Sequence, residues 1–243
     1  MCWTATVSVA MVGVGAVATG VTIMRGMPPA IPAAAAYFTS MELLQAAGYA
    51  VINQCGTPAN EVITFLSILH IVFQPFFINA FALELVPHKV KMQTRTRVYI
   101  ACAMSSIIMI LQLYPFDWAG SCRIGASLCG NQLCTVSGQW HLAWDVPYNG
   151  LLVPLENLVK IYFGFPTYMI VAFLLPLVYG AWRFVIFHAL AGPIFASSMT
   201  SNPNEVPAIW CLFSIGILLI SISPLIRVTV ENRSWYGWGK TGS

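Results

Sequence analysis

The chain has 243 residues, of which 58% are hydrophobic and only 8% are charged, and its net charge is +3. An ordinary soluble domain carries about 25% charged residues, so this composition excludes that class. It favours an all-α polytopic membrane protein. Because one crossing needs roughly 20 apolar residues, the length allows about seven crossings with short loops. We therefore expect residues 1–243 to form one membrane domain.

Apolar runs bounded by Pro, Gly, Asn and charged residues predict seven transmembrane helices. They leave one long loop, residues 116–161, between the fourth and fifth helices. Loops of this length are usually functional or contain structure of their own. The predicted spans are residues 4–24, 30–52, 61–85, 97–115, 162–181, 183–200 and 207–226.

The Lys and Arg residues are distributed asymmetrically about these spans. When sides are assigned alternately, nine of the 11 fall on one side, and only Arg123 and Lys160 fall on the other. The positive-inside rule then places the N-terminus outside and the C-terminus inside, as expected for a multi-pass protein of the bacterial inner membrane. No Lys or Arg precedes Arg25, so 4–24 lacks the basic region of a secretory signal and is expected to be retained. Since topology explains the basic residues, nucleic acid is not an expected partner.

Five of the seven cysteines fall on the predicted outer side. An oxidising outer face permits disulfides, so these five form up to two bridges with one cysteine left over, in an undetermined pairing. The alternative is a metal site formed by Cys122, Cys129 and Cys134 with His141, although this spacing matches no standard zinc pattern. We favour disulfides. The candidates are Cys2, Cys55, Cys122, Cys129 and Cys134.

The outer loop contains several residues suited to the membrane surface. Trp140, Trp144 and Tyr148 are amphipathic aromatic residues of the kind found at headgroup level. Residues 151–161 mix apolar and polar side chains, and they predict a short interfacial helix that caps a cavity from outside. If the preceding stretch is helical, His141 and Asp145 share a face. Such a pair would act as a proton acceptor or a metal ligand, or it is simply a solvated surface pair.

Polar residues inside the second and third spans give the strongest functional signal, because charged groups in a bilayer usually face a cavity or a partner. Glu42 shares a helix face with Gln45, and His70 shares one with Gln74. The predicted boundaries place Glu42 and His70 at similar depth. This pair suggests a proton relay or a cation site, with a purely structural hydrogen bond as the alternative.

Proline and histidine recur in two spans. Pro75 follows Gln74 and deprives the carbonyl of Ile71 of its helical donor, while His188 precedes Gly192 and a further proline. Zinc accepts two histidines and a glutamate, so Glu42, His70 and His188 are a candidate metal set. A haem held by His70 and His188 is a second cofactor hypothesis. The alternative is that each histidine only packs.

A short internal similarity precedes the third and seventh spans. Residues 58–62 read Pro-Ala-Asn-Glu-Val and residues 203–206 read Pro-Asn-Glu-Val. An acidic residue at a helix start is favoured by the helix dipole, so capping alone can produce the match. A true repeat would make the protein a parallel 3+1+3 arrangement, a transporter plan with its solute site between the copies.

Other seven-helix families require residues that the last span lacks. Residues 207–226 contain neither the lysine of retinal proteins nor the histidine pair of ceramidase-like hydrolases. Four stretches instead resemble a family of uncharacterised bacterial membrane proteins. The resemblance covers most of the chain and implies a topology but no activity. The stretches are Met1-Cys2-Trp3, Met41-Glu42, residues 69–77 with His70 and Gln74-Pro75, and residues 140–145.

These observations support one leading hypothesis and two alternatives. The leading one is a transporter or permease for a small solute or cation, proton-coupled through Glu42 and His70. The first alternative is an intramembrane enzyme dependent on zinc or haem. The second is an accessory subunit of a larger membrane complex, and a homo-oligomer is also compatible with the sequence. On balance, an enzyme is the less favoured class.

Overall fold

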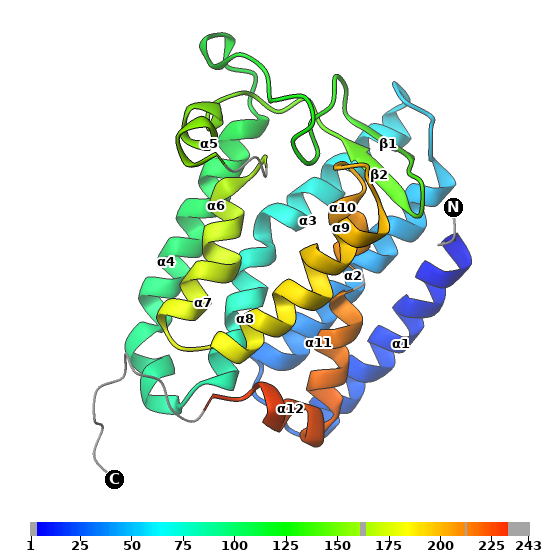
Figure 1. The fold of residues 1–243 in the computed structure, drawn as a ribbon. Helices are drawn as coiled ribbons and strands as arrows, with labels where there is room; N and C mark the ends of the chain where they lie inside the picture. Colours follow the sequence, from blue (N-terminus) through cyan, green and yellow to red (C-terminus); the bar gives the residue numbers. More distant parts are fainter. Residues whose placement is uncertain (1–3, 161–163, 212, 233–243) are drawn as a thin grey trace.

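The computed structural model of the protein describes residues 4–160, 164–211 and 213–232, and this part of the chain is mostly helical (Figure 1). Four regular helices come first, and all are connected by short turns. A short 3-10 turn, η1 (Leu83–Leu85), extends the third. The four helices are α1 (Ala5–Met24), α2 (Ala30–Ala50), α3 (Pro58–Ala82) and α4 (His88–Leu113).

The second half of the chain forms broken helices. Two π-helical segments, η3 (Ile170–Leu174) and η4 (Leu190–Ile194), interrupt the fifth and sixth predicted spans. We call α6, η3 and α7 the first arm, and α8, η4 and α9 the second arm. The short helices are α6 (Pro166–Met169), α7 (Leu175–Val178), α8 (Trp182–Ala189), α9 (Phe195–Met199), α10 (Val206–Trp210), α11 (Phe213–Ile222) and α12 (Pro224–Val230).

All seven predicted segments are therefore helical, but most are not established as membrane spans. Among the described residues, three helical stretches are long and apolar enough to cross a membrane: Ala5–Met24, Pro58–Leu85 and His88–Leu113. The first-arm stretch Pro166–Val178 is apolar but shorter. The π-helical interruptions shorten the regular helices of the fifth and sixth predicted spans, whereas α2 is long enough, at 21 residues, but not apolar enough. Length and composition support three candidate spans, fewer than the seven predicted.

The interruptions have a local cause in the sequence. Pro176 has no backbone N–H, so the carbonyl of Ala172 loses its i+4 donor. Pro193 lies inside η4, next to Gly192, whose backbone is not helical (φ −102°, ψ −107°). Segments of π-helix often occur at functional sites. Both arms thus carry a break at a similar point along their length.

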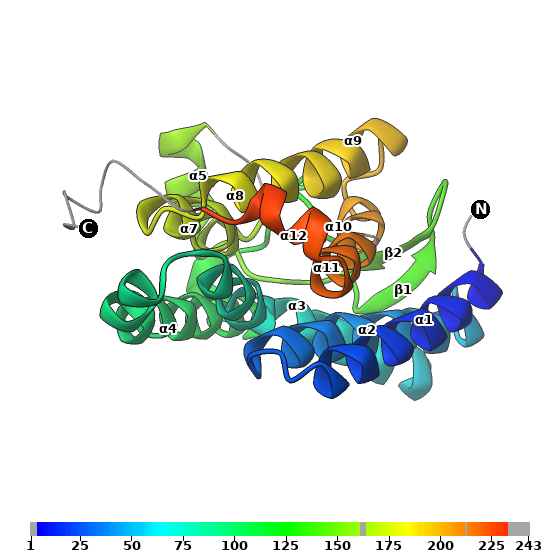
Figure 2. The same ribbon diagram turned by 90° about the horizontal axis from the view of Figure 1, so that it is seen from below.

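The helices form two layers around a shared core. Seen along the bundle, α1 to α4 lie on one side, α8 and α9 lie on the other, and α11 lies between them (Figure 2). Side chains from both sides meet in one apolar cluster, whose contacts provide most of the dispersion and hydrophobic stabilisation. Its fully buried members include Ile31, Met41, Ile68, Phe81, Phe184 and Ile217.

The two ends of the bundle differ in charge. At one end, Arg25 donates to the carbonyl of Ile222 (2.5 Å) and Arg183 to that of Glu231 (3.2 Å). Arg227 also pairs with the Glu231 carboxylate at 3.0 Å. These basic residues neutralise carbonyls at helix ends, where the dipole favours cations. The opposite end carries Arg123 and Lys160, in agreement with the charge asymmetry of the sequence.

The opposite end is covered by residues 116–160, which we call the outer cap. It contains an antiparallel hairpin of β1 (Cys134–Ser137) and β2 (Leu142–Asp145), which the sequence reading missed. A short helix is present in the stretch predicted at 151–161, as α5 (Val153–Val159), while residue 161 lies outside the described residues. Trp144 and Tyr148 are buried rather than placed at a membrane surface, because they pack inside the cap.

Candidate functional site

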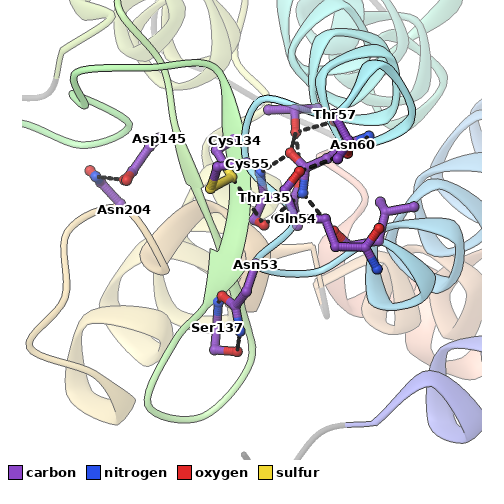
Figure 3. The surroundings of a disulfide bond; sticks show 12 residues. Asn53, Gln54, Cys55, Thr57, Asn60, Cys134, Thr135, Ser137, Asp145 and Asn204 are labelled. Carbon is purple, nitrogen blue, oxygen red and sulfur yellow. Dashed lines mark hydrogen bonds between the residues drawn. A yellow bond between two sulfur atoms is a disulfide. The ribbon is translucent and has the colours of Figure 1, made fainter.

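Two disulfides hold the outer cap. Cys55 pairs with Cys134 and ties the α2–α3 turn to β1 (Figure 3), whereas Cys122 pairs with Cys129 and closes a short loop. Four of the five candidate cysteines are therefore paired, and Cys2 lies outside the described residues. The alternative metal site of three cysteines with His141 is wrong, because a sulfur in a disulfide is not the thiolate that binds a metal. Cys102 and Cys211 are free and buried in helical segments.

The first turn of α3 forms hydrogen bonds with one edge of the hairpin. Asn60, in the first turn of α3, accepts from the backbone N–H of Thr135 and donates to its carbonyl, both at 3.0 Å (Figure 3). Its amide also donates to the carbonyl of Val51. The Asn60 side chain thus satisfies the outward-facing N–H and carbonyl of Thr135, as a neighbouring strand would. Buried polar groups are satisfied on both sides of this contact.

The other edge of the hairpin forms hydrogen bonds with residues 203–206, the second copy of the Pro-Asn-Glu-Val motif. The carbonyl of Asn204 accepts from the backbone N–H of Trp144 at 3.1 Å. Trp144 is the cross-strand partner of Thr135, so the two motif asparagines hold one residue pair from opposite sides. The amide of Asn204 donates to Asp145 at 2.7 Å. Both motifs therefore contact the hairpin, Asn60 through its side chain and Asn204 through its backbone carbonyl.

Glu205, the next residue of this motif, binds the turn of the hairpin. Its buried carboxylate accepts from the backbone N–H groups of Gln139 (3.0 Å), Trp140 (2.5 Å) and His141, and from the hydroxyl of Thr200 (2.6 Å). Three consecutive N–H groups of the hairpin turn thus surround one carboxylate. Hydrogen bonds to a charged acceptor are roughly twice as strong as neutral ones. Glu205 therefore holds the hairpin turn, whereas from the sequence it was expected only to cap a helix.

His141 and Asp145 do not form the predicted helical pair, because the stretch is a strand. The Nδ1 atom of His141 lies 2.7 Å from the N–H of Leu142 and 3.1 Å from the hydroxyl of Tyr49. A backbone N–H only donates, so Nδ1 accepts and the imidazole is neutral. Burial lowers the pKa of His141 from 6.5 to about 3. His141 and Asp145 therefore each hold the cap in place, through Tyr49 and Asn204 respectively.

Below the cap lies a cavity of about 360 Å³, within the size range of small-molecule sites. It is enclosed by α3 at the back, by the two arms at the sides, and by the loop of the Cys122–Cys129 disulfide above. None of the described lining residues is charged. The walls include Phe38, Ile71, Gln74, Ile78, Ser127, Leu128, Phe165, Tyr168, Met169, His188, Pro193, Ser197, Thr200, Ser201, Pro207, Trp210 and Cys211.

His188, in the second arm, contacts the first arm and α10 at the cavity wall. The indole N–H of Trp210 donates to Nε2 of His188 at 3.2 Å, and the backbone of Ala172 also hydrogen-bonds the imidazole. Ala172 is the residue whose carbonyl Pro176 leaves without a helical donor. A Cβ on Gly192 would lie 2.3 Å from the Trp210 nitrogen, so only glycine permits this approach. His188 thus joins the two arms and α10.

A second polar group borders the cavity. The hydroxyl of Tyr168 donates to the amide oxygen of Gln74 at 2.8 Å. Glu42 is buried in α2, and it interacts electrostatically with Cys211, which lines the cavity. Gln45, one turn further along α2, donates to the carbonyl of Ala208. The predicted residues Glu42, Gln45 and Gln74 therefore lie in or beside the cavity wall.

His70 has a different environment. Its Nε2 atom lies 2.8 Å from the carbonyl of Tyr37, its own carbonyl accepts from the Tyr37 hydroxyl at 2.6 Å, and the two rings stack. Tyr37, not Glu42, therefore lies opposite His70, and Glu42 is about 7.5 Å further along α2 at 1.5 Å per residue. The difference arises because α3 begins three residues earlier than predicted, at Pro58, and α2 ends two residues earlier, at Ala50.

The candidate metal set is not assembled. Among the described residues, no group of three or more His, Cys, Asp or Glu side chains is arranged to hold a metal ion. Glu42, His70 and His188 have separate neighbours, and His188 is already hydrogen-bonded at Nε2. The haem hypothesis meets the same obstacle, since Nε2 of His70 faces the Tyr37 carbonyl. These residues do not fit either group in this arrangement.

The sequence reading missed two residues of the cavity. Tyr168 and Trp210 both place a hydrogen-bonding group against an apolar wall, but single aromatic residues in an apolar helix are too common to signal a site. A usable signal was the clustering of Pro176, Gly192 and Pro193, which breaks both arms.

The architecture defines a class: a helical protein with membrane-length helices, a disulfide-bonded outer cap and a buried cavity. A family model described as a family of unknown function (DUF5765) matches residues 6–231, and the chain belongs to this family. The expected membership of an uncharacterised family is thereby confirmed. Comparison with curated proteins and with solved structures gave no match.

Proposed function

We propose that the protein is a multi-pass membrane protein that binds a small uncharged solute in the cavity and moves it across the bilayer. The supporting observation is the cavity itself, bounded by two arms that each carry a π-helical break. Transporter sites are typically built near the middle of the membrane from interrupted helices. The uncharged lining disfavours the cation that the sequence left open.

The proposed topology has seven crossing segments, with the N-terminus outside and the outer cap facing the oxidising compartment. Two observations support it: the disulfides lie in the cap, and most described basic residues lie at the opposite end. The inner bacterial membrane is the compartment that fits both. The similar motifs that grip the hairpin from either side also support a 3+1+3 arrangement.

Topology is tested by labelling single cysteines with a membrane-impermeant maleimide in intact cells. Trp118 is exposed in the outer cap and Lys89 is exposed at the other end. We expect Trp118→Cys to be labelled directly and Lys89→Cys only after permeabilisation. Equal labelling of both in intact cells would refute the proposed sidedness.

Solute binding is tested with the purified full chain and a library of uncharged solutes, followed by uptake of any hit into proteoliposomes. A ligand at 100 times its Kd stabilises the protein by about 2.7 kcal/mol, which thermal unfolding detects. Ser197 is exposed at the cavity mouth, so Ser197→Trp is expected to obstruct it and reduce uptake about tenfold, or about 1.4 kcal/mol. Ile107→Trp, on the exposed face of α4, is the matched control.

Proton coupling is assigned to Glu42, because it is the carboxylate beside the cavity wall. Glu42→Gln is expected to abolish proton-dependent uptake while the protein still inserts and folds. His70→Ala was expected from the sequence to do the same, but its paired bonds with Tyr37 favour a loss of stability instead. An unchanged pH profile in Glu42→Gln would remove proton coupling from the proposal.

The two alternatives have less support. The candidate ligands Glu42, His70 and His188 are not grouped, so this set is not proposed as a metal or haem centre. An accessory role in a larger complex, or a homo-oligomer, is supported by no specific contact. The larger complex and the homo-oligomer are both tested by purifying the protein from membranes and measuring the mass of the assembly.

A further inference from the structure

We infer that the cavity opens sideways into the bilayer and accepts an uncharged, lipid-soluble amphiphile directly from the membrane. This inference deepens the proposed function and rests on its membrane placement. It concerns the class of ligand and its route of entry, which a water-filled transport path would not share.

The first argument is the shape of the two arms. They are joined at the inner end by the tight turn Tyr179–Ala181, where Tyr179 bonds Asn79 of α3. Just above the turn the arms still touch, since the rings of Phe173 and His188 stack at 4.5 Å. Further out the arms diverge (Figure 1), and residues of both arms and of α3 line the cavity. We place the side opening of the cavity between these two walls.

The second argument is the exposure of residues at that opening. Met169 of the first arm and Pro193 of the second line the cavity and are half-buried, while Ser197 lines it and is exposed. The wall is thus continuous with the outer surface of the arms, and the exposed lining residues Gly125 and Ser201 show that the cavity also reaches the surface beside the cap. A closed cavity would have all of its lining residues buried.

The third argument is the chemistry of the rim. The surface residues that flank the opening are large, apolar and strongly exposed, which suits hydrocarbon and would be unfavourable around an aqueous entrance. No charged residue of the described lining guides an ion inward. The flanking residues are Ile170 (48% exposed), Leu174 (54%), Leu190 (57%) and Ile194 (56%).

The lining also orients the ligand. Its deep wall is largely apolar, with Ile71, Ile78 and Trp210. The polar side chains there are already hydrogen-bonded, Gln74 to Tyr168 and His188 to Trp210. Hydroxyl groups gather toward the cap, where Ser127 and Ser197 line the outer part of the cavity. An apolar chain or ring directed inward, with one hydroxyl or carbonyl group toward the cap, matches this distribution.

The test is photo-crosslinking of the full chain in phosphatidylcholine nanodiscs. The probe is a hexadecanol analogue that carries a diazirine and an alkyne, and labelled peptides are identified by mass spectrometry. We expect labelling of the arms around Met169 and Pro193 that unlabelled hexadecanol saturates. Ser197→Trp should reduce this labelling about tenfold, or about 1.4 kcal/mol, whereas Ile107→Trp on α4 should not.

A second probe keeps the same chain but carries a quaternary ammonium head. We expect it to label the cavity weakly, because no described lining residue is anionic. Labelling confined to exposed faces such as α1 and α4, without saturation, would overturn the inference, as would equal cavity labelling by the charged probe. Saturable labelling without any solute uptake would refute transport but leave lateral entry intact. Uptake of a water-soluble solute without cavity labelling would do the reverse.

Discussion

The outer cap and the cavity beneath it are stabilised in opposite ways. In the cap, buried polar groups such as Asn60 and Glu205 satisfy specific backbone partners, and two disulfides fix the chain. Around the cavity, broken helices are joined by few polar contacts, chiefly those of His188 and Gln74. The difference indicates a rigid cover over walls that can adjust, which is a useful division for a ligand-binding protein.

The largest expected effect is loss of the long-range disulfide. Cys55 and Cys134 are separated by 79 residues, and the chain-entropy model gives about 4.5 kcal/mol for such a loop. The seven-residue separation of Cys122 and Cys129 gives about 2.5 kcal/mol in the same model. We expect Cys55→Ser to lower the free energy of unfolding more than Cys122→Ser, as measured by chemical denaturation in detergent. The reverse order would mean that the α2–α3 turn does not anchor the cap.

Removal of the Glu205 carboxylate is expected to follow closely. Glu205→Ala leaves buried N–H groups of the hairpin turn without an acceptor, at a cost of about 3 kcal/mol. Glu61 is its equivalent in the first motif but is exposed, so Glu61→Ala is the matched control and should change stability by less than about 0.5 kcal/mol. Equal effects in the unfolding experiment would show that the carboxylate does not hold the cap.

Acid is expected to weaken the cap through His141. Its pKa is about 3 in the folded protein and 6.5 in the unfolded chain, so the unfolded state binds more protons between these values. The stabilisation that neutral His141 contributes is fully present above pH 6.5. Between pH 6.5 and about 3 it falls by about 1.4 kcal/mol for each pH unit. Denaturation at pH 7.0 and pH 5.5 measures this slope. His141→Gln should flatten it, and an unchanged slope in that variant would assign the acid sensitivity elsewhere.

The smallest effect is expected at the cavity. Gly192→Ala places a methyl group against Trp210, and such overpacking typically costs about 1 to 3 kcal/mol. The neighbouring cavity gives the indole room to move, so we expect the low end of this range, about 1 kcal/mol, together with a shift in tryptophan emission. Ala191→Ser, a small change at the adjacent half-buried position, is the control. A loss as large as that of Glu205→Ala would show that the cavity walls are as rigid as the cap.

Several features of this molecule were accessible from the sequence because they depend on local composition. Apolar runs located all seven helical segments, and the charge pattern separated the two ends of the bundle. The same pattern placed five cysteines on one side, of which four are paired. The outer short helix was predicted at 151–161 and is found at Val153–Val159.

Other features depended on contacts between residues distant in the chain. The outer hairpin was missed because its strands have four residues each and are held by Asn60 and Asn204, which no local pattern reveals. The depth of His70 was misjudged because a shift of three residues at the start of a helix moves a side chain by almost a full turn. The candidate site changed accordingly, from the pair of Glu42 and His70 to a cavity lined by Gln74 and His188.

The sequence by itself determined that the chain is helical and apolar, which residues form helices, and which end carries the basic charge. Those properties follow from hydropathy and charge counted along the chain. Only the tertiary structure decided which cysteines pair, that Glu205 is anchored by the hairpin turn, and that the two arms enclose a cavity. These depend on where proline and glycine bend each helix and on which distant groups then meet.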